Sequence, residues 1–167
     1  RIEVQGERRE LKSEKTKLRE IFQNAVQVCR PGADEKRIRI ELAGDENLTA
    51  VVDPVLIEQA VVNLLDNAVK YSDAETAVRL AAEQTANEIR ISVQDHGIGI
   101  ERKHLPRLFE RFYRVDKARS RAMGGTGLGL AIVKHISQVH GGCVDVASGL
   151  NEGSTFTIHL PRDPNPA

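Results

Sequence analysis

The hydrophobic and polar positions of the chain change their period several times, and these changes predict alternating helices and strands. A first helix is predicted from apolar residues at near-helical spacing, which are Leu18, Ile21, Phe22, Ala25, Val26 and Val28. We expect this helix to stop at Pro31 and Gly32, because proline interrupts a helix and glycine favours its end.

A strand is predicted next, where Ile38, Ile40 and Leu42 alternate with charged residues. A Gly-Asp turn at 44–45 follows this strand. Residues 48–52 come after the turn and are predicted to be the hairpin partner of the strand.

A second helix is predicted over residues 54–71. Asp53 supplies an N-cap acceptor, and Pro54 stands at the first helical position, where the N–H that proline lacks would have no helical partner. Ser72 and Asp73 then end the helix.

The rest of the pattern completes the expected fold. It predicts strands at 78–83 and 88–94, a short helix at 102–109, a helix from a glycine cluster to about residue 139, and a strand pair at 143–147 and 155–160. Several strands look hairpin-linked, and steady βαβ crossovers are absent. We therefore expect a two-layer α/β sandwich: a mixed, mostly antiparallel sheet of about five strands with about three helices on one face.

Composition narrows the class of protein. The 167 residues suffice for one domain, and 40% hydrophobic residues suffice for a core, which aliphatic side chains must fill because aromatics are 4%. The 24 basic and 24 acidic residues cancel, whereas a dedicated nucleic-acid binder usually has a basic excess. Cys29 and Cys143 are expected to be free thiols of a reducing cytoplasm.

The sequence has no run of about 18 apolar residues and no signal peptide. We expect residues 1–17 to be a linker or the frayed end of a longer helix, 18–161 to be one domain, and 162–167 to be a tail. The start at Arg1 is compatible with a fragment that has a membrane segment upstream.

Two asparagines lie inside the second predicted helix, although asparagine is a poor helix former. Asn63, Asn67 and Lys70 share one side of this helix at i, i+4 and i+7. A solvated polar face is one explanation. The other is a metal and phosphate site, because an amide carbonyl suits Mg²⁺ and a lysine meets a phosphate as a point charge.

Asp95 ends a predicted strand, and Gly97 and Gly99 follow at alternate positions. Glycine lets a flat ligand approach the backbone closely, and a carboxylate accepts a hydrogen bond from an amino group such as that of adenine. The Rossmann spacing is absent, and a plain turn is the alternative explanation. His96 is expected to be an ordinary turn residue rather than a metal ligand.

A glycine cluster at 124–129 leads directly into a predicted helix. Exposed N–H groups at a helix start bind phosphate, and the Walker pattern is absent. Leu128 and Leu130 beside the glycines indicate a packed loop rather than a slack connector. The preceding residues 110–123 carry five basic and two acidic residues, an excess of three, which predicts either a solvated loop or a movable cationic lid.

Taken in order, these motifs resemble the N, G1, F and G2 boxes of sensor histidine kinases. The order is Asn63…Asn67…Lys70-Tyr71, then Asp95-x-Gly97-x-Gly99, then Phe109-Glu110-Arg111-Phe112-Tyr113-Arg114, then Gly125-Thr126-Gly127-Leu128-Gly129-Leu130. Four boxes in this order are highly specific, and the resemblance covers residues 18–161. The stretch 112–121 is similar to that of the phosphate-regulon sensor kinases.

The resemblance implies the Bergerat ATP-binding fold shared with gyrase, Hsp90 and MutL, with ATP and Mg²⁺ as cofactors. It implies that Asn67, with Asn63, lies at Mg²⁺ and that Asp95 meets the adenine amino group. It implies catalytic roles near the phosphates for Lys70 and Arg114. The other nucleotide-binding residues that it implies are Tyr71, Gly97, Gly99, Ile100, Tyr113, Gly125, Thr126, Gly127, Leu128, Gly129, Leu130 and Ser154.

The resemblance further implies a protein-histidine kinase that transfers the ATP γ-phosphoryl group to a histidine on a separate dimerisation domain, with a response regulator as a further partner. None of the five histidines is followed by the acceptor-helix pattern of the family. We therefore expect the chain to bind ATP without phosphorylating itself and to be monomeric. We expect it to belong to the cytoplasmic portion of a membrane-anchored sensor and to contact neither nucleic acid nor the membrane.

Three other functions stay open. They are an ATPase of the gyrase, Hsp90 or MutL kind, an anti-sigma-type serine kinase, and a degenerate nucleotide-binding regulatory module. Asn63 stands where the related ATPases carry glutamate, and an amide cannot take a proton from water, so slow hydrolysis is expected. The linker-like residues 1–17 favour the sensor kinase.

Overall fold

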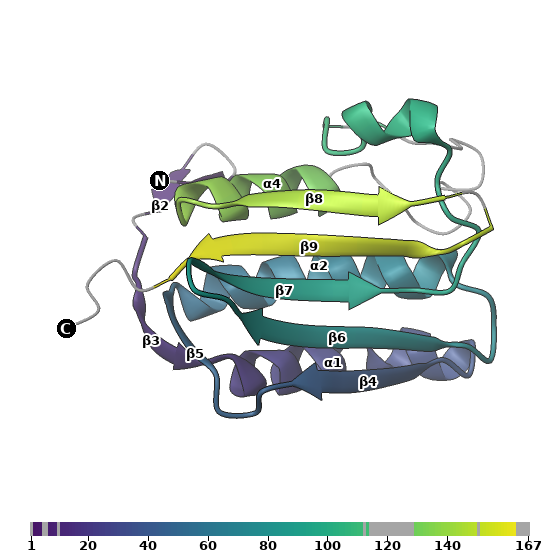
Figure 1. The fold of residues 1–167 in the computed structure, drawn as a ribbon, viewed down its shortest axis with the longest axis horizontal. Coiled ribbons are helices and arrows are strands. Elements are labelled where there is room, and N and C mark those ends of the chain that lie inside the picture. Colours follow the sequence, from purple (N-terminus) through teal and green to yellow (C-terminus); the bar gives the residue numbers. More distant parts are fainter. Residues whose placement is uncertain are drawn as a thin grey trace.

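The computed structural model shows a layer of strands backed by helices (Figure 1). The residues that it describes are 2–4, 7–9, 11–111, 113, 129–149 and 151–162. Among these residues, no helix combines the length and the apolar character needed to cross a membrane.

The main sheet has five strands in the spatial order β4, β6, β7, β9, β8. These are β4 (Arg39–Gly44), β6 (Ala77–Gln84), β7 (Glu88–Gln94), β8 (Cys143–Ser148) and β9 (Ser154–Pro161). β4 runs parallel to β6, and the other three neighbouring pairs are antiparallel.

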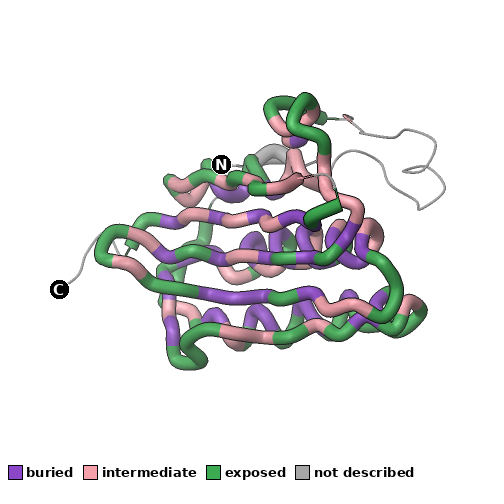
Figure 2. Tube along the Cα trace, turned by 45° about the vertical axis from the view of Figure 1, so that its right-hand side comes forward, coloured by how far each residue is buried: buried purple, intermediate pink, exposed green. Residues whose placement is uncertain are grey.

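Three α-helices of the described residues cover one face of this sheet: α1 (Leu18–Glu35), α2 (Pro54–Tyr71) and α4 (Gly129–Val139) (Figure 1). The strands bury alternate residues against them, as Ile91 and Arg90 illustrate in β7, where the first is buried and the second exposed. Figure 2 shows this alternation along the strands. The predicted fold class is therefore confirmed.

The central helix, α2, begins and ends where the sequence predicted. Asp53 is fully buried, and its Oδ1 accepts a hydrogen bond from the Leu56 N–H at 3.3 Å, which caps the first turn. Ile57, Val61 and Leu64 expose no surface, because α2 packs against α1, α4 and the sheet.

The predicted end of the first helix at Pro31 was wrong. α1 runs on to Glu35 with Pro31 inside it. Proline removes one helical N–H, but Pro31 and Gly32 both face solvent, whereas Ala33 is buried in the core. Burial of Ala33 explains why the last turn stays helical.

The predicted hairpin between residues 38–42 and 48–52 is not formed. β5 (Thr49–Val52) pairs antiparallel with β3 (Glu14–Lys17), and β4 pairs with β6 instead. Because β4 and β6 are parallel, the chain between them must cross over the sheet, and it does so through α2.

Three short strands precede α1 among the described residues. β1 (Ile2–Val4) and β2 (Glu7–Arg9) pair antiparallel, and β3 follows them. The Lys12 N–H donates to Asp53 Oδ2 at 3.0 Å, which joins this N-terminal segment to the cap of α2. Its assignment as the end of an acceptor hairpin stays a prediction, as do the domain boundaries.

His140 links the end of α4 to the start of α2. Its Nδ1 donates to the Ile136 carbonyl at 2.7 Å, and its Nε2 accepts from the Asp53 N–H at 3.0 Å. A ring that accepts at Nε2 must be neutral. Burial lowers the pKa of His140, against the opposing effects of the Ile136 carbonyl and the Asp53 charge.

We predict that His140 destabilises the protein in acid. As the pH falls below the ordinary histidine pKa of 6.5, the unfolded chain takes up a proton that folded His140 resists. The free energy of unfolding then falls by up to about 1.4 kcal/mol per pH unit from this one group. The glutamine of the His140→Gln variant cannot titrate. The free energy of unfolding, measured with urea at several pH values below 6.5, should therefore change less steeply with pH for this variant than for wild type.

His159 offers a matched control on the open face of the sheet. Its Nδ1 lies 3.0 Å from Glu88 and its Nε2 2.8 Å from Asp145. Burial opposes the charged ring, but the two carboxylates raise the pKa of His159 above 6.5. The stabilisation by protonated His159 is complete below pH 6.5 and is lost at higher pH. His159→Gln should therefore alter the pH dependence of the free energy of unfolding only above pH 6.5. Identical slopes below that pH for wild type and His140→Gln would contradict the prediction.

Candidate functional site

The polar side of α2 lies against the start of α4. Asn63 and Asn67 are half-buried, and Asn63 Nδ2 donates to the Gly129 carbonyl at 3.4 Å. Gly129 is the first residue of α4, and a Cβ placed there would lie 4.0 Å from the Asn63 side chain. A purely solvated helix face does not account for this contact.

The amide oxygens of this face fit a magnesium ion that brings its own further ligands. No group of three or more His, Cys, Asp or Glu side chains that could hold a metal occurs within the described part of the chain. Mg²⁺ keeps waters and takes phosphate oxygens rather than filling an all-protein cage. Asn63 and Asn67 suit such an ion only together with a phosphate ligand.

Lys70 lies on the same side of α2, in its last turn. Its Nζ lies 3.0 Å from Asp66 Oδ2, and the two side chains are 28% and 55% exposed. Asp66 was not among the residues predicted from the sequence, although its i, i+4 spacing to Lys70 was a usable signal. An exposed ion pair of this kind is weak, so the Lys70 ammonium remains available to a phosphate.

Ser72, which follows α2, meets the loop after β7 through an antiparallel bridge to Gly97. A Cβ on Gly97 would lie 2.1 Å from the Tyr71 carbonyl oxygen. No side chain fits at that distance, so the close approach requires glycine. This junction brings two predicted site residues, Tyr71 and Gly97, into direct contact.

Asp95 is held in a fixed orientation beside this junction. It is 4% exposed, and its Oδ1 accepts from the backbone N–H groups of Gly97 at 3.0 Å and Ser154 at 3.1 Å. Within the described residues, Oδ2 has no hydrogen-bond partner. Burial raises the pKa of Asp95, although the two N–H groups and His96 act in the other direction. An oriented carboxylate with one spare oxygen matches the amino group of an adenine.

The turn between β8 and β9 fastens the loop that follows β7. The Ser148 hydroxyl accepts from the Ile100 N–H at 2.8 Å and also bonds to the Ser154 hydroxyl at 2.8 Å. Gly99 has a φ of +72°, and a Cβ there would lie 1.9 Å from the Gly149 carbonyl oxygen. The predicted residues Gly99, Ile100 and Ser154 therefore all contact the segment 148–154, and Ser154 also donates to the buried carboxylate.

The short helix predicted at 102–109 is a 3-10 helix, η1 (Arg102–Arg107). Leu108 behind it is buried, and the Phe109 ring meets Phe156 of β9 edge-on, with the ring centroids 6.1 Å apart. These two side chains anchor η1 to the core.

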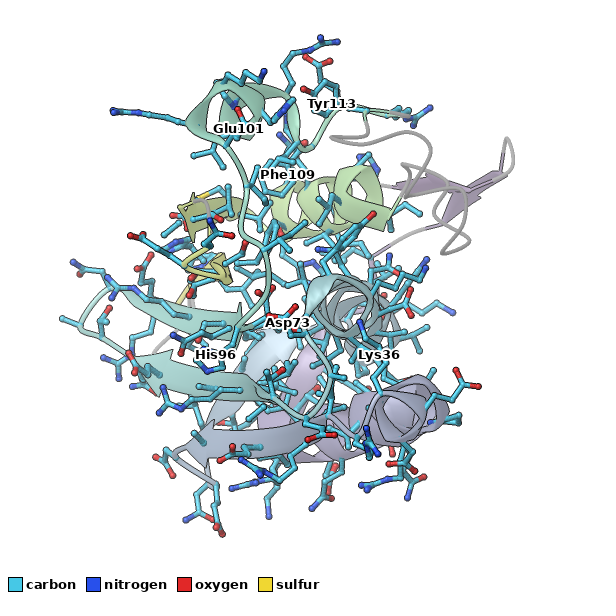
Figure 3. The ribbon with its side chains drawn as sticks, turned by 90° about the vertical axis from the view of Figure 1, so that its right-hand side faces the viewer. Lys36, Asp73, His96, Glu101, Phe109 and Tyr113 are labelled. Atoms are coloured by element: carbon cyan, nitrogen blue, oxygen red, sulfur yellow. The ribbon has the colours of Figure 1, made fainter. Side chains whose placement is uncertain are left out.

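Tyr113 lies against η1 rather than against the carboxylate or the amides. The Arg107 guanidinium lies 4.6 Å from its ring centroid, and its hydroxyl bonds to His104 Nδ1. In Figure 3, Tyr113 and Glu101 both lie at the top of the view, beside η1, and His96 lies well below them. A role of Tyr113 at the phosphates stays a prediction.

Several predicted residues lie outside the described part of the chain: Arg114, Gly125, Thr126, Gly127 and Leu128. Most of the stretch predicted to be a solvated loop or a cationic lid, residues 112 and 114–123, also lies outside it. Gly129 and Leu130, at the other end of the predicted glycine motif, form the first turn of α4 next to Asn63.

A protein-family model matches residues 52–164, which is most of the chain. Its description is "Histidine kinase-, DNA gyrase B-, and HSP90-like ATPase". The matched stretch contains α2, the Asp95 loop and α4.

Two sensor proteins illustrate the relatives. The chain is 43% identical over 146 residues to the sensor-like histidine kinase SenX3 of Mycolicibacterium smegmatis, an alignment that covers 87% of this chain and 38% of SenX3. It is 52% identical over 107 residues to the phosphate regulon sensor protein PhoR of Pseudomonas aeruginosa, covering 62% of this chain and 24% of PhoR. The chain thus spans well under half the length of these relatives.

Solved structures of the same kind share the fold. Full-length ShkA, in a complex with AMPPNP, superimposes with a TM-score of 0.81 at 32% identity, over 95% of this chain and 33% of ShkA. The mycobacterial sensor histidine kinase MprB gives a TM-score of 0.77 at 29% identity, over 92% of this chain and 100% of that chain. The chain therefore belongs to the family of histidine kinase-, DNA gyrase B- and HSP90-like ATPases, as an ATP-binding domain of the sensor histidine kinase type.

Proposed function

We propose that the chain is the catalytic domain of a two-component sensor histidine kinase, which transfers the γ-phosphoryl group of ATP to a histidine on a separate dimerisation domain. The observation that carries this proposal is the Ser72–Gly97 junction. It joins the Asp95 carboxylate on one side to the polar end of α2 on the other. A nucleotide has the same two-ended chemistry, with a base at one end and metal-bound phosphates at the other.

Each side chain has a defined part in this proposal. Asp95 accepts a hydrogen bond from the adenine amino group. Asn67, with Asn63, holds Mg²⁺, which neutralises phosphate charge when bound. The proposal gives Lys70 and Arg114 the role of neutralising phosphate charge. Phosphoryl transfer needs positioning and charge neutralisation more than covalent chemistry from the protein, and this set supplies both.

Asn63 distinguishes this site from that of an ATPase. Its amide lies in contact with the start of α4, through the bond to the Gly129 carbonyl. A neutral amide cannot accept a proton from water. ATP is therefore hydrolysed slowly, and its γ-phosphoryl group is left for an external nucleophile.

The proposed partners are the dimerisation and phosphoacceptor domain of the same protein and a response regulator. The names of SenX3, PhoR and MprB support a sensor kinase, and the AMPPNP complex of ShkA supports an adenine nucleotide as ligand. We assign the domain to the cytoplasmic portion of a membrane-anchored sensor.

Transfer to the acceptor domain tests the proposal. The chain, mixed with the separately expressed acceptor domain and ATP labelled at the γ-phosphate, should give an acid-labile label on histidine. Acid-stable label on serine would support an anti-sigma-type kinase. Brisk hydrolysis without transfer would support an ATPase, and tight binding with neither reaction a regulatory module. Each of these three results would overturn the proposal.

Asp95→Asn should weaken ATP binding by roughly 10- to 100-fold, because it replaces a charge-assisted acceptor and presents N–H groups to the adenine amino group. Titration calorimetry of the variant measures the loss. Asp145→Asn, on the exposed strand β8, is the matched control and should bind ATP like wild type. Unchanged affinity of the Asp95 variant would remove the carboxylate from the adenine site.

Asn67→Ala should abolish most of the gain in ATP affinity that Mg²⁺ provides, because it removes an oxygen ligand of the metal. Calorimetry with Mg²⁺ and with a chelator gives this gain as a ratio of two dissociation constants. Asn87→Ala, an exposed amide in the turn between β6 and β7, is the control and should keep the ratio. A wild-type protein that is folded and shows no Mg²⁺-dependent affinity would contradict the metal assignment.

A further inference from the structure

Lys36 is placed to control the end of α2 from a different helix. It is the residue that follows α1 and caps it. Its Nζ donates to the backbone carbonyls of Val69 at 2.9 Å and Lys70 at 3.1 Å, and also to that of Ser72. An ammonium group has three N–H donors, and here they converge on three carbonyls at the end of α2.

The carbonyls at this position need such a partner. The last four carbonyls of an α-helix have no helical N–H to accept, and the negative end of the helix dipole favours a cation. Basic side chains of the same helix often fill this role, but the Lys70 ammonium lies 3.0 Å from Asp66 Oδ2 rather than at these carbonyls. The cation at the end of α2 is therefore supplied from 33 residues or more away in sequence.

The base of the Lys36 side chain is itself fixed. The Lys36 N–H donates to the Ala33 carbonyl at 3.2 Å, and its own carbonyl accepts from the Glu75 N–H at 3.0 Å. Arg37, the next residue, forms an ion pair with Glu75 at 2.6 Å. The segment after α1 and the segment after α2 are thus joined by both backbone and side chains.

The end of α2 also forms the junction with the loop of Asp95 and Gly97, which we call the adenine loop. Ser72 is 3% exposed, and its Oγ has no hydrogen-bond partner within the described residues. Its place therefore depends on its backbone: the N–H donates to the Ala68 carbonyl at 3.0 Å, the carbonyl accepts from Lys36, and the bridge to Gly97 completes the set. Figure 3 looks onto this end of the molecule, where Lys36 and His96 lie on opposite sides of the loop that bears Asp73.

We propose that Lys36 is a positioning residue for the nucleotide: by holding three carbonyls at the end of α2, it sets the place of the phosphate-facing turn relative to the adenine loop. The inference rests on the proposed nucleotide site. Lys36 does not touch the ligand in this proposal. It acts through Lys70, whose carbonyl it binds, and through Ser72, which bridges to Gly97.

Lys36→Met keeps the length of the side chain and removes the donors. We expect this variant to bind Mg²⁺-ATP at least about tenfold more weakly in titration calorimetry. We also expect a smaller ratio between the affinities with and without Mg²⁺, because the phosphate-facing turn moves while Asp95 keeps its backbone donors. Lys36→Arg retains a cationic donor and should lie closer to wild type than Lys36→Met.

A loss of stability alone must not be mistaken for positioning. Ala60→Gly, in the buried middle of α2, lowers helix stability by about 1 kcal/mol without touching either end and is the matched control. Thermal unfolding of both variants sets a temperature at which each is folded. There, Ala60→Gly should retain both the affinity and the Mg²⁺ ratio of wild type.

The outcomes separate the two proposals. If wild type binds no Mg²⁺-ATP, the proposed function fails. If wild type binds and Lys36→Met binds within threefold of it, or if Ala60→Gly loses as much affinity as Lys36→Met, the positioning role is overturned.

Discussion

The close contact between the end of α2 and the loop after β7 is the constraint on which the proposed site depends. At this point a backbone carbonyl, that of Tyr71, occupies the space where any residue other than glycine at position 97 would place its Cβ. No side chain therefore fits between the two segments at this point. The carboxylate of Asp95 and the amides of α2 inherit a fixed separation from this contact, as a ligand with two distinct ends requires.

Burial of Asp95 gives this separation its chemical use. A buried carboxylate without donors would take up a proton, and burial does raise the pKa of Asp95. The Gly97 and Ser154 N–H groups oppose that shift and orient the group through one oxygen. The turn between β8 and β9 is fastened to the loop by Ser148, so the donor from Ser154 cannot drift away. Glycine is required at 97, 99 and 153, because a Cβ at any of these positions would overlap a backbone oxygen of a neighbouring segment.

The parts of the structure that sequence could predict are those that local chemistry determines. Asp53 and Pro54 determine the start of α2, and alternation determines the buried face of β7. The prediction of a hairpin after β4 was wrong because alternation identifies a strand but not its partner. β5 pairs instead with a segment more than 30 residues earlier. Pro31 misled because the burial of Ala33 is a tertiary effect. Lys36 carries no local signal at all, since its acceptors belong to another helix.

α2 is held at both ends by side chains and backbone groups from other elements. At its start, Asp53 receives the Lys12 N–H, and its own N–H donates to His140 of α4. At its end, Lys36 binds the last carbonyls. A shift of either end of α2 would therefore break bonds to a different element. The N-terminal segment that contacts Asp53 and the turn that we propose to face the phosphates are thus bonded to opposite ends of one helix.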